Sequence, residues 1–412
     1  FPAFGDSQTR AIGTPDEGKT SWAEGDELLL EMTSKTLGTK YAAFKYNGSN
    51  WELASGELSY KEDEVPTFPH VYYAPNYKWE AGELVLKEGK VAGTDEYIEG
   101  KANITSNGQG INVSFADATR NYSRLRIATM PNMPITVTID RYTPAGSSDM
   151  KWDQNYTLTS DEKGNAYLYG TFENNSEVTV KYREAALTTH TFSQATESAK
   201  SYALDATVIS ANSAEEIKSA IEQKVADGKT AIRLNLASDA GDNEFKAIRE
   251  AFKNVKSGTI DLTLIGCKEI PADGLNNQSG GLEALKSITL PDVTKIGKNA
   301  LLFCVDLEEI NTPNVTSIHE NAFGGCTNLQ KITFGELTEV KGLSHDYDGI
   351  LDPGVNTERI NLVLSENQKV MTKNRQGNEY FWTPTKEYYK GIVEYGSPSF
   401  LEYTFNSVSF KK

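Results

Sequence analysis

The residues that most often perform catalysis are dispersed in this sequence and form no complete motif. The four histidines are His70, His190, His319 and His345. The segment from His319 to Phe323 begins like the helix of a zinc protease, but it lacks the second histidine that would complete the metal site. Ser148 and Lys151 have S-x-x-K spacing, but the companion motifs of a penicillin-type nucleophile are missing. We therefore predict a protein without enzymatic activity and without a cofactor.

An acidic segment around residue 350 is the best metal candidate in the sequence. Asp346, Asp348 and Asp352 bring three carboxylates together with a glycine within seven residues. Carboxylate oxygens are typical Ca²⁺ ligands, but the spacing is not that of an EF-hand loop. We prefer the interpretation that this segment is a solvated acidic turn.

The charge balance excludes one class of partner. The 412 residues include 41 Lys and Arg against 57 Asp and Glu, a net charge of −16, and no basic cluster stands out. Because nucleic-acid binding depends on cations that neutralise phosphates, nucleic acid is not an expected partner. No apolar run approaches the ~20 residues needed to cross a bilayer. The sequence opens on Phe1 without an initiator Met, so we expect a mature or truncated form of an exported protein.

A period of 22 residues organises the region between Leu285 and Val340. The recurring apolar positions are Leu285, Leu307 and Leu329; Ile288, Ile310 and Ile332; Val293, Val315 and Leu337; and Ile296, Ile318 and Val340. A fixed period of this length indicates stacked coils, each of which buries its apolar residues against the next. We predict a solenoid in which Ile288, Ile310 and Ile332 form one column of a parallel ladder.

Polar residues flank this isoleucine column and should face outward, because successive side chains of a strand alternate between faces. They are Ser287, Thr289, Glu309, Asn311, Lys331 and Thr333. We predict that this polar row is the ligand-contact surface of the solenoid. The alternative is a plain solvated sheet face.

Two cysteines keep the same period. Cys304 and Cys326 would lie on neighbouring coils, which stack about 4.8 Å apart, within the range of a disulfide. Small buried thiols that pack between coils are the alternative, and we favour it because Cys is among the most buried residue types.

The rest of the chain predicts a mainly β, multidomain protein. After a flexible lead-in at 1–20, short alternating strands with turns between them indicate two β-sandwiches, at 21–100 and 101–210. Helical spacing begins after Ser213, a plausible N-cap, and predicts a helical cap on the solenoid. We therefore expect a short α/β solenoid with this cap at 211–344 and a C-terminal cap at 345–412.

The repeat resembles the BspA-type leucine-rich repeat, L-x-x-I-x-L-P followed by I-x-x-x-A-F-x-x-C. The segments Leu285–Cys304 and Leu307–Cys326 carry most of that pattern. The resemblance implies a protein of the bacterial or protist cell surface that adheres to host proteins or to other microbes.

The segment Trp22–Leu30 is similar to the W-x-x-G-D-x-[IL] opening of fimbrillin-like proteins of the Bacteroidales, among them Bacteroides. This resemblance implies two transthyretin-like sandwiches, export as a lipoprotein, and a place in fimbriae or on the outer membrane. Some fimbrillins mature by cleavage after an N-terminal arginine, which frees a groove for the donor strand of the next subunit, and Arg10 resembles such a site. The expected lipobox cysteine is absent, which we take to reflect truncation just after it.

These features predict a non-enzymatic surface protein, exported and lipid-anchored, that binds a host or microbial surface protein. Contact with the membrane is expected only through a lipid anchor outside this sequence. One alternative is a fimbrial structural or tip subunit that assembles by donor-strand exchange. Another is a glycan-binding module that uses the aromatic residues between Tyr380 and Tyr389.

Overall fold

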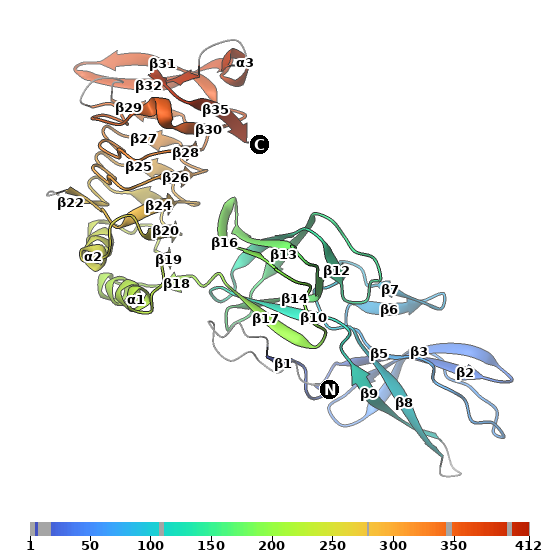
Figure 1. Ribbon diagram of the computed structural model, residues 1–412. Coiled ribbons are helices and arrows are strands. Elements are labelled where there is room, and N and C mark those ends of the chain that lie inside the picture. The colour runs from blue at the N-terminus through green and yellow to red at the C-terminus, as the bar shows by residue number, and fades with distance from the viewer. Residues whose placement is uncertain are drawn as a thin grey trace. The chain divides into compact units, whose positions relative to one another are not determined.

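The structure is a computed structural model that describes residues 5–6, 18–106, 111–277, 280–342, 348–393 and 398–411. The chain is mainly β and forms several sheets, as the sequence predicts (Figure 1). It divides into two compact units. The first consists of Phe1–Lys181 and Thr188–Ala206, and the second of Tyr182–Leu187 and Thr207–Lys412.

An antiparallel sheet, the N-terminal sheet, opens the first unit, with the strand order β4-β3-β2-β5-β8-β9. Its strands are β2 (Glu27–Ser34), β3 (Gly38–Tyr46), β4 (Trp51–Gly56), β5 (Val71–Tyr73), β8 (Ile98–Ser106) and β9 (Ile111–Thr119). β8 pairs with β5, so this sheet crosses the boundary expected at residue 100. Strand pairing between distant segments leaves no local signal in the sequence, so the sequence alone does not predict that this sheet continues past residue 100.

The N-terminal sheet carries apolar side chains on both faces. Leu29 of β2 packs with Ala43 and Tyr77 on one face, where Trp79 and Leu84 of a hairpin cover them. That hairpin consists of β6 (Tyr77–Glu80) and β7 (Glu83–Leu86). Leu28 and Leu30 point to the other face, because neighbouring residues of a strand alternate.

Two further sheets complete the first unit. One has the order β1-β17-β10-β14-β12 and the other β13-β11-β15-β16. Their strands are β1 (Gly5–Asp6), β10 (Ser123–Ala128), β11 (Pro134–Ile139), β12 (Tyr142–Pro144), β13 (Gln154–Thr159), β14 (Asn165–Phe172), β15 (Glu177–Tyr182), β16 (Ala185–Thr191) and β17 (Lys200–Asp205). Tyr142 connects the two sheets, with its ring 5.8 Å from that of Tyr156 and 4.8 Å from that of Phe172.

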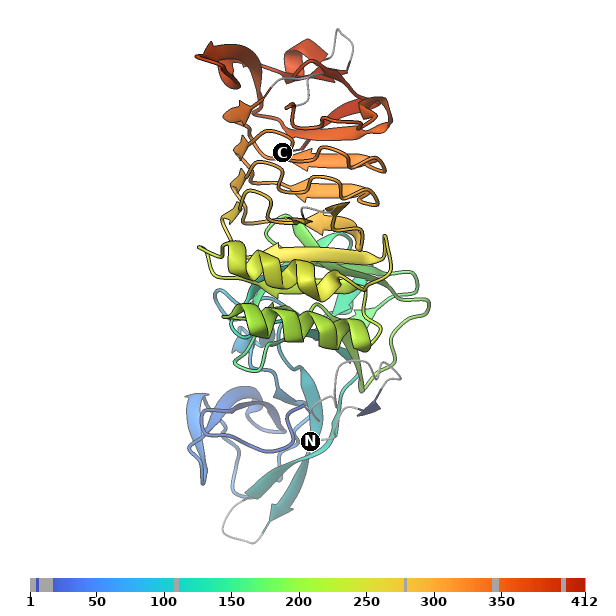
Figure 2. The same ribbon diagram turned by 90° about the vertical axis from the view of Figure 1, so that its left-hand side faces the viewer.

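The second unit contains two long helices, α1 (Ala214–Ala226) and α2 (Asp242–Phe252), which lie side by side (Figure 2). The predicted N-cap is present, since the Ser213 hydroxyl accepts a hydrogen bond of 3.2 Å from the Glu216 amide. Ile217 and Ile221 are the fully buried residues of α1, and Phe245, Ile248 and Phe252 are those of α2. The helices thereby cover one end of the core of the second unit.

The long parallel sheet is the main element of the second unit, with the order β18-β19-β20-β24-β26-β28-β30-β35. Its strands are β18 (Ile209–Ser210), β19 (Ala231–Asn235), β20 (Ile260–Ile265), β24 (Leu285–Thr289), β26 (Glu309–Thr312), β28 (Lys331–Phe334), β30 (Asn361–Ser365) and β35 (Ser407–Lys411). Ile288, Ile310 and Ile332 pair in register and are fully buried, so the predicted column is confirmed. It continues through Leu362 to Val408.

A short parallel sheet forms the opposite side of the coils. Its strands β21 (Glu269–Ile270), β25 (Lys295–Ile296), β27 (Ser317–Ile318) and β29 (Glu339–Lys341) pair in that order. The hairpin of β31 (Lys369–Gln376) and β32 (Glu379–Tyr388) then pairs antiparallel with β29. The remaining elements are β22 (Asn276–Asn277), β23 (Gly280–Gly281), η2 (Thr357–Arg359), α3 (Lys390–Val393), β33 (Ser399–Phe400) and β34 (Tyr403–Thr404).

Two buried polar side chains inside the coils make hydrogen bonds to backbone carbonyl groups. Thr312 interrupts the apolar column, but its buried hydroxyl donates a hydrogen bond of 2.9 Å to the Thr333 carbonyl. Cys267, Cys304 and Cys326 lie in the described part of the chain and are free, buried thiols, so the disulfide alternative was wrong. The Cys326 thiol donates to the Leu301 carbonyl over 3.2 Å.

Candidate binding surface

A polar column runs along the outer face of the long parallel sheet, one residue before the buried column on each strand. Its members occupy paired positions on successive strands and are Asp261, Ser287, Glu309, Lys331, Asn361 and Ser407. The 22-residue period predicts three of these residues, Ser287, Glu309 and Lys331. Asp261, Asn361 and Ser407 were missed, because the strands that carry them lie outside the regular repeat.

Neighbouring side chains of the column bond to one another across the coils. The Ser287 hydroxyl donates to Asp261 Oδ1 over 2.6 Å, and the Ser407 hydroxyl donates to Asn361 Oδ1 over 2.7 Å. Between these pairs, Lys331 Nζ lies 2.7 Å from Glu309 Oε1. The Lys331 and Glu309 side chains are 48% and 41% exposed, so this ion pair remains accessible to a partner while it adds little to stability.

A second polar row lies beside the first and completes a groove of about 430 Å³. This row consists of Lys286, Glu308 and Gln330, which also keep the 22-residue period. Backbone bonds of 2.8 and 2.9 Å join Glu308 to Lys286 and Gln330 to Glu308. The described residues that line the groove are all polar or charged, and we call this surface the ladder face. Its residues are Asp261, Lys286, Ser287, Glu308, Glu309, Gln330, Lys331 and Asn361.

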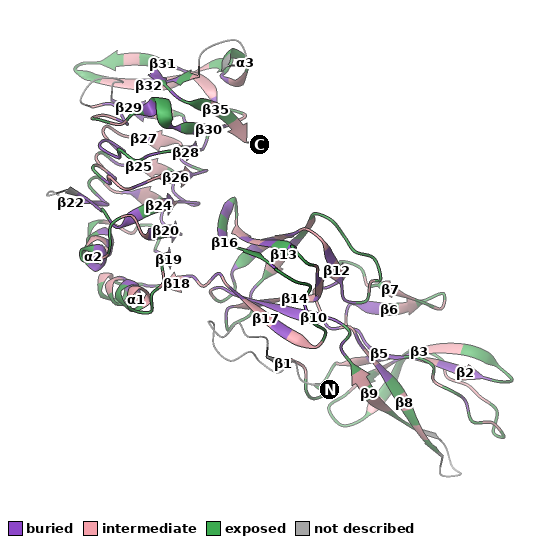
Figure 3. Cartoon of the chain, in the orientation of Figure 1, coloured by how far each residue is buried: buried purple, intermediate pink, exposed green. Residues whose placement is uncertain are grey.

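The other half of the predicted contact row is less accessible. Thr289 and Asn311 are half-buried, and Thr333 is only 7% exposed. Figure 3 colours the strands of this sheet by how far their residues are buried. Thr333 was therefore wrongly expected to face solvent. Alternation along a strand gives the direction of a side chain but not what covers it.

The two metal candidates that the structure describes are Asp348 and Asp352. The third candidate, Asp346, lies outside the described residues, and so does Arg10, the predicted cleavage site. Asp352 Oδ2 accepts a hydrogen bond of 2.7 Å from the Tyr403 hydroxyl, and burial together with this carboxylate raises the pKa of Tyr403. Asp348 belongs to the turn just before Asp352. Within the described ranges, no group of three or more His, Cys, Asp or Glu side chains is placed to hold a metal ion.

The two segments that resemble catalytic motifs do not have the local structure that those motifs require. The segment from His319 to Phe323 follows β27 as a turn rather than a helix, so it cannot present the face of a zinc-protease helix. Burial, together with the positive charge of Lys341, lowers the pKa of His319. Ser148 and Lys151 lie in an exposed connection, where Lys151 is 3.9 Å from Asp149.

The aromatic segment proposed for glycans is partly built into the core. Trp382 is buried and donates a hydrogen bond of 3.2 Å to the Gly342 carbonyl. Tyr389 is also buried, against Phe400 and Phe410. Tyr388 is exposed, with Lys369 Nζ 3.9 Å from its ring centre. Two of these rings therefore close the end of the stack and are not available to stack on a sugar.

The comparisons with known proteins concern the same coils. A family model described as the BspA type leucine rich repeat region, in six copies, matches residues 249–344. No curated protein and no solved structure matches the chain. The repeat match suggests a bacterial surface protein that binds proteins or takes part in adhesion, and such repeats are typically non-enzymatic. Among the described residues, no helix is both long and apolar enough to cross a membrane.

Proposed function

We propose that this chain is a non-enzymatic bacterial surface protein that binds a host or microbial surface protein through the ladder face. The observation that carries the proposal is the groove on that face, lined by in-register charged and amide side chains above a fully buried column. In this proposal residues 211–344 are a capped solenoid. Two transthyretin-like sandwiches would present it from a lipid-anchored position on the outer membrane.

The rigidity of the ladder face supports a binding role. Six of its eight side chains project from strands of the long parallel sheet, and Ile310 beneath them is fully buried. A surface that is ordered before binding loses little conformational entropy when a partner docks. The mixed charges would then select the partner, because like charges placed opposite each other are costly.

The composition of the groove indicates the chemistry of the partner. Three carboxylates, of Asp261, Glu308 and Glu309, stand beside the ammonium groups of Lys286 and Lys331. A complementary surface would therefore present both Lys or Arg and Asp or Glu, together with amides that pair with Gln330 and Asn361. A typical protein interface covers about 800 Å² per partner, so residues beside the groove would also contribute to binding.

A charge swap tests the proposal, with a built-in control on the short parallel sheet. The double variant Glu309→Lys with Lys331→Glu keeps an ion pair between the coils but reverses its direction. The matched control is Glu269→Lys with Lys295→Glu, since that pair is also 2.7 Å apart and similarly exposed. Labelled protein is incubated with epithelial and bacterial cells, either intact or stripped of surface protein by protease.

We expect saturable binding to intact cells that falls more than tenfold for the ladder-face swap and stays unchanged for the control. Binding that survives protease treatment, or that responds equally to the two swaps, would refute the ladder face as a protein-binding surface.

A fimbrial subunit is the second candidate function, and β1 is the observation that favours it. Gly5 and Asp6 pair in parallel with Lys200 and Ser201 of β17, at the edge of their sheet. Cleavage after Arg10 would release this strand and leave the β17 edge open to a strand from another subunit. Denaturant-resistant ladders after trypsin treatment, absent in Arg10→Ala, are expected of such a subunit. A protein that stays monomeric after cleavage would count against it.

A further inference from the structure

The second face of the N-terminal sheet holds a cavity of about 620 Å³, far from the ladder face in the sequence. Six aromatic side chains line it: Trp22, Phe44, Trp51, Tyr60, Phe68 and Phe115. Among the described residues that line the cavity none is charged, and only Tyr60 and Ser114 carry a hydroxyl group. Such a cavity favours an uncharged, apolar ligand group, and its volume is in the range of small-molecule sites.

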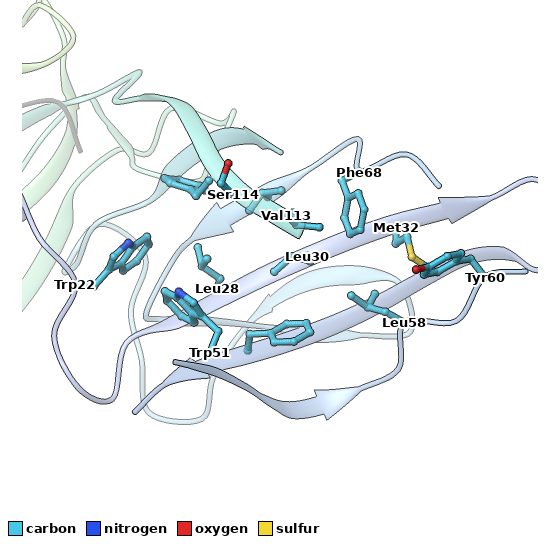
Figure 4. Close-up of a pocket in the computed structure, with 13 residues that line it drawn as sticks. Trp22, Leu28, Leu30, Met32, Trp51, Leu58, Tyr60, Phe68, Val113 and Ser114 are labelled. Atoms are coloured by element: carbon cyan, nitrogen blue, oxygen red, sulfur yellow. The ribbon is translucent and has the colours of Figure 1, made fainter. Parts of the chain in front are cut away.

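The cavity is elongated. Leu28, Leu30 and Met32 alternate along β2 and form its floor, with Trp22 and Trp51 toward one end and Tyr60 toward the other (Figure 4). The rings at the first end are in contact, since the centre of Trp22 is 4.8 Å from that of Trp51 and 5.8 Å from that of Phe115. Four residue steps of a strand separate Leu28 from Met32, about 13 Å.

This length suits an alkyl chain. A C–C bond of about 1.52 Å advances an extended chain by about 1.25 Å, so about ten methylene groups match the floor. A branched or polycyclic molecule would match a rounder cavity better. An alkyl chain can pack against the Met32 thioether and the aromatic rings without making hydrogen bonds.

The backbone below the cavity argues against a peptide strand on this floor. β2 is paired along its whole length with β3 and, at Leu29 and Leu30, with β5. The Glu31 and Thr33 amides donate to the His70 and Thr67 carbonyls over 2.9 and 2.8 Å. A peptide laid over this floor would press its own amide groups onto apolar side chains, which is costly unless they are paired elsewhere. An alkyl chain has no such groups.

We propose that this cavity binds the unbranched chain of a medium-length fatty acid or alcohol. The polar head group remains in solvent, because the lining has no charge to accompany it. This site is independent of the proposed adhesive function, since it lies in the other unit of the chain.

The test uses the two tryptophans of the lining. Bromine quenches tryptophan fluorescence on contact, so 11-bromoundecanoic acid is titrated into the full chain. Trp22 and Trp51 line the cavity, whereas Trp79, Trp152 and Trp382 do not. We expect saturable quenching, which is reduced in Trp51→Phe and unchanged in Trp152→Phe. Competition by octanol, decanol and dodecanol should tighten about fourfold per added methylene, the usual value for burial of a CH₂ group.

A charge in the lining supplies the second test. Phe68→Glu introduces a carboxylate beside the cavity and should weaken binding more than tenfold. Leu53→Glu is the matched control, because Leu53 is exposed on β4 of the same sheet and does not line the cavity. If Phe68→Glu does not fold, Trp51→Phe and the chain-length series still decide. Quenching that is linear, independent of chain length, or reversed only by an alternating apolar peptide would overturn the proposal.

Discussion

Truncation of Ile310 to Ala should destabilise the coil unit strongly, because this side chain is the centre of the buried column. Ile310 is fully buried between Ile288 and Ile332, and both neighbours are held in register by backbone pairing. Ile→Ala substitutions in protein cores cost about 2–5 kcal/mol, and the cost is greatest where the surroundings cannot collapse into the cavity. A column fixed on both sides by parallel strands has little freedom to collapse. We therefore expect a loss of about 4 kcal/mol.

The assay is urea unfolding followed by tryptophan emission. Trp382, which is buried, is the single tryptophan in the sequence of the second unit, so the part of the emission change that Trp382→Phe removes reports that unit. With a slope of about 2 kcal/mol per M, the midpoint of that transition should fall by about 2 M. Ile392→Ala is the control, because Ile392 is exposed and its truncation should change stability by less than about 0.5 kcal/mol. Equal midpoints for the two variants would refute a tightly packed column.

Three further outcomes follow from the contacts of the second unit. Ser213→Ala should cost about 1 kcal/mol in the same urea titration, because the hydroxyl caps α1, whereas Ser213→Asp should retain most of that energy. Burial raises the pKa of the Cys326 thiol and raises the pKa of the Cys267 thiol to about 12. Neither thiol should therefore react with a thiol reagent at pH 8 until urea unfolds the unit. Fast labelling of the native protein would contradict their burial. The pKa of His319 is lowered in the folded state, so the unfolded state takes up a proton first as the pH falls below about 6.5, and stability is lost below that pH. His319→Gln should therefore lose less stability between pH 7.5 and pH 5.5 than the unaltered chain. Equal losses would argue against this contribution.

The repeat could be read from the sequence because its signal is local and periodic. Ile288, Ile310 and Ile332 recur at one fixed step, and each is paired with the next in the structure. The cap of α1 was also predictable, because Ser213 and Glu216 are close in sequence. Both predictions depend on the spacing of residues along the sequence, which can be counted directly.

The extent of the ladder face was not predictable, for a physical reason. Asp261 lies 26 residues before its partner Ser287, and Asn361 lies 30 residues after its partner Lys331, so a period of 22 does not find them. The step from Asn361 to Ser407 is 46 residues. The cavity was missed for a related reason. Trp22, Phe68 and Phe115 come from distant segments, which the pairing of β2 with β5, of β5 with β8 and of β8 with β9 brings together.

The parallel register of the coils has a mechanical consequence. Hydrogen bonds between β24, β26, β28 and β30 point from coil to coil, along the direction in which the coils stack. A tensile load along the stack therefore reaches these ladders in series, so that each coil boundary carries the whole load. Such a stack would open one boundary at a time, starting at the weakest, and would lengthen under force before it failed completely.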